Sequence, residues 1–266
     1  MNDQVLLDIR GVVATLTLNR PRAMNSLGVE MGKALLARVQ ELQAAQGVKA
    51  IIVTGAGEHF MAGGDIKEFH TIVAAAPETR RQTFEGLIAQ FVHPAIEILR
   101  ALPQPVIAKV RGACAGFGFS LMAGCDLSIA ADNAYFTTGY SLLGTTADGG
   151  STYFLPRLVG AKRAAELMLL ADRIDSQQAL ALGLLNRVVP LVELDAACEA
   201  LAQRLAAGPP HAHAGTKRLL QQSLGNSLAD QLHAEAQSFA RCSASADFAE
   251  GVSAFIEKRK PQFKGN

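Results

Sequence analysis

The sequence predicts an α/β fold in which strands and helices alternate before a helical C-terminal region. Two runs of β-branched and other apolar residues flank a glycine near the N-terminus, as in a β-hairpin. Strand-like and helix-like segments then alternate up to about residue 130, which implies crossover connections and a mostly parallel sheet system. From residue 161 onward the composition is typical of helices.

The first elements are predicted from residue spacing. The segment QVLLDIRGVVATLTLNR predicts two strands that turn at Arg10 and Gly11. Residues 29–45 carry apolar side chains three or four positions apart, which predicts an amphipathic helix that Gly47 ends. KAIIVTGAG, residues 49–57, predicts a short buried strand that runs into a glycine loop.

A second round of elements follows, after which helices dominate. It comprises a helix within 84–101, a strand at 105–110, a helix near 117–124 and a strand at 126–130. Later helices are predicted at 161–170, 176–183, 194–208, 214–225, 227–241 and 245–259. The break at Gly208-Pro209-Pro210 divides a core, residues 1–207, from a tail, residues 208–266. Apolar stripes on the tail imply that it packs on the core or on a neighbouring subunit.

Bulk composition excludes several classes of protein. The chain has 266 residues, 49% of them hydrophobic, but no apolar run long enough to cross a bilayer, roughly 18 residues. The N-terminus lacks the pattern of a secretory signal, and acidic Asp3 and Asp8 argue against a transit peptide. A net charge of +1 gives no basis for nucleic-acid binding. We therefore expect a cytoplasmic protein without membrane or nucleic-acid partners.

The cysteines predict no disulfide framework and no metal site. The four are scattered without CxxC spacing, so we expect reduced, buried packing residues. They are Cys114, Cys125, Cys198 and Cys242. No metal and no resident cofactor are expected.

Two glycine-rich loops are the strongest local signals of function. They are HFMAGGDIKEF at 59–69 and VRGACAGFGFSLMAGCD at 110–126. Each places glycine between a strand and a helix-like segment, which lets backbone N–H groups approach a ligand, so both are candidate anion holes. The alternative is that these glycines only make tight turns. Neither loop matches a P-loop or a dinucleotide-binding fingerprint.

Six blocks of the sequence, in this order, resemble those of a known family. They are RPRAMNSL, AIIVTGAGEHFMAGGDIKE, PVIAKVRGACAGFGFSLMAGCDLSIA, LLGTTADGGSTYFLPRLVG, ALALGLLNRVVP and EGVSAFIEKRKPQFKG. Together they cover essentially the whole chain and resemble the crotonase superfamily of enoyl-CoA hydratases and isomerases. This resemblance implies an α/β spiral of ββα turns, a helical C-terminal region that forms trimers or hexamers, and an acyl-CoA substrate.

The resemblance assigns two oxyanion-hole N–H groups, one in each loop, to Gly64 and Phe117. Removing a proton next to a thioester puts negative charge on the carbonyl oxygen, and two preorganised donors stabilise that charge where it develops. The resemblance thus selects the anion-hole interpretation of both loops. Coenzyme A enters as part of the substrate.

Coenzyme A contacts are implied at two places along the chain. The matching positions near the first loop are Arg22, Ala62, Asp65, Ile66 and Lys67, and those at the adenine end, often from a neighbouring subunit, are Phe255 and Lys258. The alternative is that these residues are ordinary surface cations and packing residues.

The sequence departs from the hydratase pattern at its two glutamates. The matching positions hold Ser120 and Tyr140, neither of which is an effective general base near neutral pH. Asp148 matches the position at which several isomerases and dehalogenases of the family carry a working carboxylate. Its alternative role is to cap the helix that begins at GGSTYFL.

One carboxylate suffices to shift a double bond, so the first hypothesis is an enoyl-CoA isomerase with Asp148 as acid and base. A hydratase with an altered site is the second. Asp148 could also attack an activated carbon as a nucleophile, as in a hydrolase or dehalogenase, and His93 matches the base of the dehalogenases. A local structural role is the alternative for His93.

A further hypothesis comes from another functional class, an inactive CoA-binding or RNA-binding relative. The near-neutral charge argues against RNA, and the presence of Asp148 and both loops argues against an inactive protein.

Overall fold

A sheet of six strands forms the centre of the computed structural model, which describes residues 3–266. Its order is β1-β2-β3-β4-β6-β9, with β1 antiparallel to β2 and every other pair parallel. The strands are β1 (Val5–Arg10), β2 (Val13–Leu18), β3 (Ala50–Gly55), β4 (Val106–Val110), β6 (Leu127–Ala131) and β9 (Arg187–Val189). The predicted N-terminal hairpin and mostly parallel sheet are confirmed.

A second sheet consists of three short strands, which alternate in the sequence with strands of the large sheet. Its members are β5 (Ala113–Ala115), β7 (Tyr135–Thr137) and β8 (Ile174–Asp175), in the order β5-β7-β8. The chain leaves β4 for β5 through Gly112, whose φ is +54° and whose Cβ position would lie 2.3 Å from the Glu58 carbonyl oxygen. Only glycine allows this sharp transfer between sheets.

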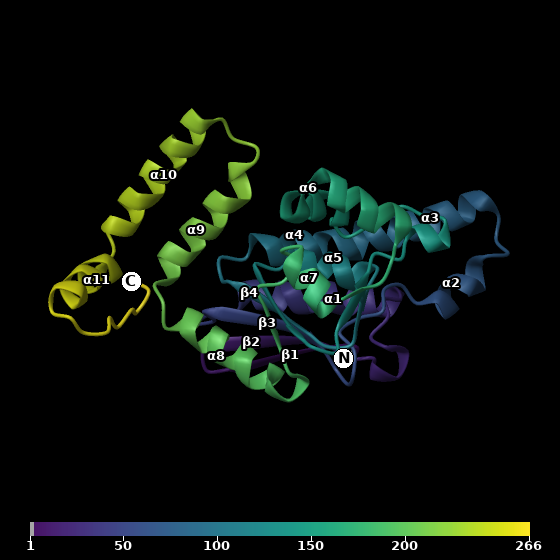
Figure 1. Cartoon of the computed structure of the whole chain (residues 1–266), viewed down its shortest axis with the longest axis horizontal. Coiled ribbons are helices and arrows are strands. Elements are labelled where there is room, and N and C mark those ends of the chain that lie inside the picture. The colour runs from purple at the N-terminus through teal and green to yellow at the C-terminus, as the bar shows by residue number, and fades with distance from the viewer. Residues whose placement is uncertain (1–2) are drawn as a thin grey trace.

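Helices cover both faces of the large sheet (Figure 1). They are α1 (Val29–Ala44), α2 (Ile66–Ile72), α3 (Pro77–Leu87), α4 (His93–Ala101), α5 (Phe117–Gly124), α6 (Ser151–Leu170), α7 (Ser176–Ala181), α8 (Leu194–Ala206), α9 (Pro210–Ser223), α10 (Leu228–Ser243) and α11 (Ala246–Ile256). Alternate residues of β3 face opposite layers: Ile51 and Val53 pack with the core that includes α1 and α4, whereas Ala50 and Ile52 pack with α8.

Several helix boundaries differ from the sequence prediction. The helix expected within 84–101 begins at Pro77, a residue suited to a first helical position, and a π-helical turn at Ile88–Val92 interrupts it. The helix expected at 161–170 already begins at Ser151 and kinks at Gly160. Helix α1 ends at Ala44 with Ala45 as its cap, so Gly47 lies beyond its end and does not terminate it.

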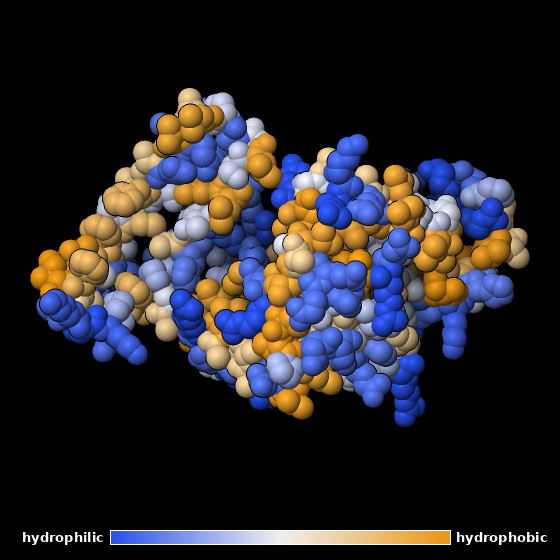
Figure 2. All heavy atoms as spheres, in the orientation of Figure 1, coloured by the Kyte–Doolittle hydropathy of each residue, from blue (hydrophilic) through white to orange (hydrophobic). Residues whose placement is uncertain are grey.

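Helices α9, α10 and α11 and the chain that follows them form an arm, residues 210–266, that extends from the body (Figure 1). Figure 2 shows hydrophobic residues gathered at the outer end of this arm. Its exposed large hydrophobic residues are Leu220, Leu224, Leu228, Leu232, Phe239, Phe248, Val252, Phe255 and Ile256. The predicted apolar stripes therefore do not pack on the core of the same chain.

Within residues 3–266, no helix has the length and apolar character that crossing a membrane would require. All four cysteines are free; Cys114, Cys125 and Cys198 are buried as expected, whereas Cys242 in the arm is only partly buried.

Candidate active site

The two glycine loops meet at Gly63 and Gly116. Both residues adopt left-handed φ angles, +91° and +51°. A Cβ on Gly116 would lie 3.1 Å from the Gly63 Cα, so the two backbones touch where any side chain would separate them. A parallel bridge between Met61 and Cys114 ties the loops together on one side.

Each of these glycines is followed by a residue whose N–H group has no protein partner. Within the described part of the chain, the N–H groups of Gly64 and Phe117 donate to no protein acceptor. The Gly64 nitrogen lies 4.0 Å from the Cβ position of Gly116, which precedes Phe117. Phe117 is also the first residue of α5, so its N–H lies at the positive end of that helix. These two N–H groups, of Gly64 and Phe117, are called the N–H pair.

Two glycines follow Asp148 in the loop before α6. Gly149 and Gly150 both adopt left-handed φ angles, +59° and +88°. A Cβ on Gly149 would lie 2.7 Å from the Phe117 ring and 3.0 Å from the Ser120 Cβ. The loop before α6 therefore packs tightly on the first turn of α5.

Four side chains form one hydrogen-bonded cluster at this loop. The Tyr140 hydroxyl donates to Asp148 Oδ1 over 2.5 Å. Ser120 Oγ lies 3.0 Å from the Tyr140 hydroxyl, 2.9 Å from the Asp148 main-chain oxygen and 2.5 Å from Ser151 Oγ. The structure thus brings together Ser120, Tyr140 and Asp148, which the sequence singled out, and adds Ser151, which it did not.

The capping alternative for Asp148 is wrong. Helix α6 has Gly150 as its N-cap, and no side chain caps it. Asp148 meets this helix only through its carbonyl oxygen, which accepts from the Ser151 N–H over 3.3 Å. The carboxylate instead accepts from Tyr140.

Burial perturbs both titratable members of the cluster. It raises the pKa of Asp148, and this effect outweighs the opposing effects of the Tyr140 hydrogen bond and of the His93 charge. Burial, with a contribution from the Asp148 charge, also raises the pKa of Tyr140. Tyr140 therefore stays protonated at neutral pH and serves as a donor, whereas Asp148 takes up a proton more readily than an exposed aspartate.

His93 lies near Asp148 but outside the cluster. It is the first residue of α4, directly after the π-helical turn. Its side chain is exposed, and its charge lowers the pKa of Asp148. Within residues 3–266, no hydrogen bond joins the His93 and Asp148 side chains.

Residues predicted to contact coenzyme A near the first loop have different environments. Arg22, Ile66 and Lys67 are exposed. Asp65 accepts from the Arg20 guanidinium over 2.8 Å and caps α2 through the N–H groups of Lys67 and Glu68, so its carboxylate is engaged within the protein. The Ala62 N–H donates to the Met24 carbonyl over 3.0 Å.

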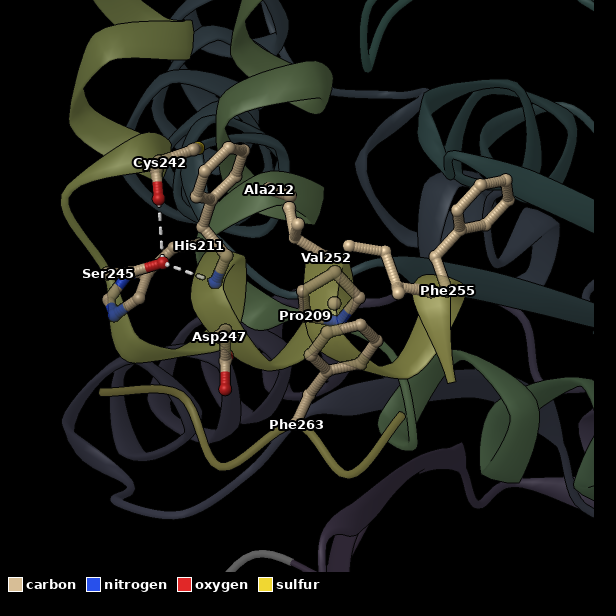
Figure 3. A pocket seen from close by; sticks show the side chains of 12 residues that line it. Pro209, His211, Ala212, Cys242, Ser245, Asp247, Val252, Phe255 and Phe263 are labelled. Atoms are coloured by element: carbon tan, nitrogen blue, oxygen red, sulfur yellow. Dashed lines mark hydrogen bonds between the residues drawn. The ribbon is translucent and has the colours of Figure 1, made fainter. Parts of the chain in front are cut away.

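The residues predicted at the adenine end lie in the arm. Phe255 is 86% exposed near the end of α11, and Lys258 follows that helix. Phe255 borders an apolar pocket of about 370 Å³ between α9, α11 and the C-terminal chain around Phe263 (Figure 3). Neither Asp148 nor the N–H pair lines this pocket, so the single chain does not join the two predicted regions.

No group of three or more His, Cys, Asp or Glu side chains within residues 3–266 could hold a metal ion. The cluster instead offers a carboxylate, hydroxyl donors and two free backbone N–H groups. Such a set can exchange a proton and stabilise a neighbouring oxyanion.

This chain is similar in sequence to several known proteins. The enoyl-CoA hydratase/isomerase family model matches residues 8–266. The 1,2-epoxyphenylacetyl-CoA isomerase of Escherichia coli is 35% identical over 100% of both chains. The short-chain-enoyl-CoA hydratase of Clostridium acetobutylicum is 35% identical over 97% of this chain and 96% of its own.

Solved structures agree as well. The structure of an enoyl-CoA hydratase from Polaromonas sp. JS666 matches with a TM-score of 0.89 at 34% identity, covering 98% of this chain and 99% of that one. The crotonase fold, with its C-terminal helices, is therefore confirmed. On the sequence and on the fold alike, this chain is a member of the enoyl-CoA hydratase/isomerase family within the crotonase superfamily.

Proposed function

We propose that this enzyme is an enoyl-CoA isomerase in which Asp148 is both acid and base. The observation that carries the proposal is the composition of the cluster. Asp148 is the carboxylate in it, and the two positions of the hydratase glutamates are filled by Ser120 and Tyr140, whose hydroxyls hydrogen-bond to Asp148.

The proposed reaction uses the N–H pair and Asp148 together. Asp148 removes a proton from the α-carbon of a 3-enoyl-CoA, and the electron pair delocalises onto the thioester oxygen. The N–H groups of Gly64 and Phe117 stabilise that oxyanion. Asp148 then returns the proton to the γ-carbon, the double bond moves to C2–C3, and the carboxylate is regenerated. The raised pKa of Asp148 favours this use, because it brings the carboxyl closer to the pH at which it works.

Hydration is the second candidate, since more of the similar proteins are named hydratases than isomerases. It requires activation of water near C3. Tyr140 is a poor base for that step because its pKa is raised further above neutrality. Isomerisation is the first candidate because it needs one carboxylate only.

Coenzyme A is proposed to lie along the exposed Arg22 and Lys67, with further contacts from Ala62, Asp65 and Ile66. Arg22 and Lys67 would meet phosphates, whereas Asp65 supports α2 through its cap and its pair with Arg20. Phe255 and Lys258 are proposed to reach the adenine end from a neighbouring subunit of a homotrimer or hexamer. Cytoplasmic localisation and the absence of a resident cofactor are parts of the same proposal.

The decisive experiment compares two substrates in two variants. A 3-hexenoyl-CoA reports double-bond migration and crotonyl-CoA reports hydration, each followed with wild type and with Asp148→Asn. We expect isomerisation in wild type and a loss of about 10²- to 10⁴-fold in kcat in the variant. Asp172→Asn, at an exposed aspartate, is the matched control and should leave the rate unchanged. Rapid hydration that survives Asp148→Asn would contradict the proposal.

A deuterium label at C2 tests the return of the proton. One carboxylate that removes and returns the proton should carry part of the label to C4 of the product. Complete exchange of the label with water in every turnover would argue for separate acid and base groups.

A further inference from the structure

The hydrogen bonds around Asp148 form a chain with a single direction. A carboxylate has no proton to give, so Tyr140 donates to Asp148 Oδ1. A main-chain oxygen only accepts, and the Gly116 carbonyl oxygen is 3.5 Å from Ser120 Oγ, longer than the other contacts. Ser120 therefore donates either to the Asp148 carbonyl or to the Tyr140 hydroxyl oxygen. In both arrangements the single proton of Ser120 is used, and Ser151 must be the donor in its contact with Ser120. The chain therefore runs from Ser151 to Ser120 and ends either on the Asp148 carbonyl or, through Tyr140, on the Asp148 carboxylate.

The far end of this chain is closed. Ser120 and Ser151 are both 0% exposed. A proton that reaches Ser151 would meet protein packing instead of solvent, so the chain is suited to holding Asp148 and unsuited to carrying protons to water.

We infer that Tyr140, Ser120 and Ser151 are positioning residues that fix Asp148 through Oδ1 and leave Oδ2 as the oxygen that exchanges protons with the substrate. The reaction in this statement rests on the proposed function. The hydrogen-bond chain itself does not, because it fixes Asp148 in any reaction of this site.

The charge of Asp148 depends on the hydrogen bond that Tyr140 donates. Burial favours the protonated carboxyl, and the Tyr140 donor and the His93 charge on α4 oppose that effect by stabilising the carboxylate. Removing the tyrosine hydroxyl leaves only the His93 charge and the Asp148 backbone N–H to oppose the effect of burial. Tyr140→Phe should therefore move the titration of Asp148 to higher pH, and Ser151→Ala should move it in the same direction by less.

Nuclear magnetic resonance tests this without any substrate. Protein labelled with ¹³C at the aspartate side-chain carboxyls gives one signal that disappears in Asp148→Asn, and this signal is titrated in each variant. Tyr153→Phe is the matched control, since Tyr153 is half exposed on α6 with its ring stacked on Arg157. We expect an upward shift of the midpoint in Tyr140→Phe and none in Tyr153→Phe. An unchanged midpoint in Tyr140→Phe would overturn the inference.

Kinetics provide the second measurement. With a 3-enoyl-CoA, Tyr140→Phe should lower kcat about 10- to 100-fold on the acidic side of the profile of kcat against pH. This is the size expected for loss of a hydrogen bond to a charged group. Part of the loss should be regained at higher pH, and KM should change little. A loss of kcat that is equal at every pH would show a merely structural role. If wild type does not isomerise at all, the proposed function fails, and the titration still decides the inference.

Discussion

Gly149 lies against the aromatic ring of Phe117, and a Cβ on this glycine would come within 2.7 Å of a ring carbon. On one side of the contact is Asp148, the proposed base, and on the other is the N–H group of Phe117, a proposed oxyanion donor. The contact therefore joins the loop that carries the proposed base to the residue that carries the proposed donor. Because both partners are packed, neither can move away without cost.

Gly149→Ala should lower kcat by more than the accompanying loss of folding stability would explain. The added methyl group must displace the Phe117 ring, and φ of +59° already disfavours alanine. We expect kcat to fall by about 100-fold, because small displacements of catalytic groups have effects of that size, while KM changes less. Steady-state kinetics with a 3-enoyl-CoA measure both.

Gly144→Ala is the matched control for this substitution. Gly144 has a similar left-handed φ of +69°, but nothing lies within 4 Å of its Cβ position. Gly144→Ala should cost about 1 kcal/mol of folding stability through backbone strain and leave kcat near the wild-type value. Equal losses of kcat in both variants would show that backbone strain, and not contact with Phe117, is responsible.

Asp148→Asn should stabilise the folded protein at pH 7 while it abolishes activity. Burial raises the pKa of Asp148 above its unfolded value, so keeping this group charged costs stability at every pH above the folded pKa. The cost disappears as pH falls below the unfolded pKa, near 4. The variant should therefore melt roughly 2 °C or more above wild type at pH 7 and lose that advantage near pH 4. A lower melting temperature at pH 7 would contradict this sign.

Much of the fold could be predicted because its signals are local. Ile51 and Val53 alternate with Ala50 and Ile52, so β3 was recognisable as a strand buried on both faces. Strands β5, β7 and β8 have only two or three residues each, too few to show a period. Their pairing depends on the sharp turn at Gly112, which spacing alone does not reveal.

The site likewise contains residues that the sequence singled out and one that it missed. Gly64 and Phe117 lie in glycine-rich loops that the resemblance to a family singled out, and the structure brings these two loops into contact. Ser151 was missed because its partner Ser120 lies 31 residues earlier, and only the packing of α6 on α5 brings the two hydroxyls together. A serine at a helix start also has an ordinary interpretation, so no local signal marked it.

The exposed apolar surface of the arm predicts association of the chain with copies of itself. Phe255 and Ile256 are 86% and 74% exposed, which is unusual for large apolar side chains unless another surface covers them. A Phe255→Asp/Ile256→Asp variant should shift the protein from a trimer or hexamer to smaller species, measured by light scattering after size-exclusion chromatography. Val192→Asp, at a 91% exposed valine outside the arm, is the control and should keep the wild-type size. A wild-type monomer would contradict the prediction.

Asp126 should be the most sensitive point in the attachment of the arm to the body. Its carboxylate accepts from Arg100 over 2.9 Å and pairs with Lys217 of α9 over 2.8 Å, and the Lys217 side chain is only 9% exposed. Asp126→Asn leaves two partly buried cations without their counter-charge, so we expect a loss on the order of 3 kcal/mol in the free energy of unfolding. Chemical denaturation measures this loss.

Asp195 is the matched control for Asp126, because it also bridges two cations, Lys109 and Arg111, each over 2.7 Å. Its side chain is 70% exposed, so solvent screens the pairs and Asp195→Asn should cost less than about 1 kcal/mol. Burial, and not the number of ion pairs, is thus expected to decide the difference. Similar losses in the two variants would show that the charges around Asp126 are as well solvated as those around Asp195.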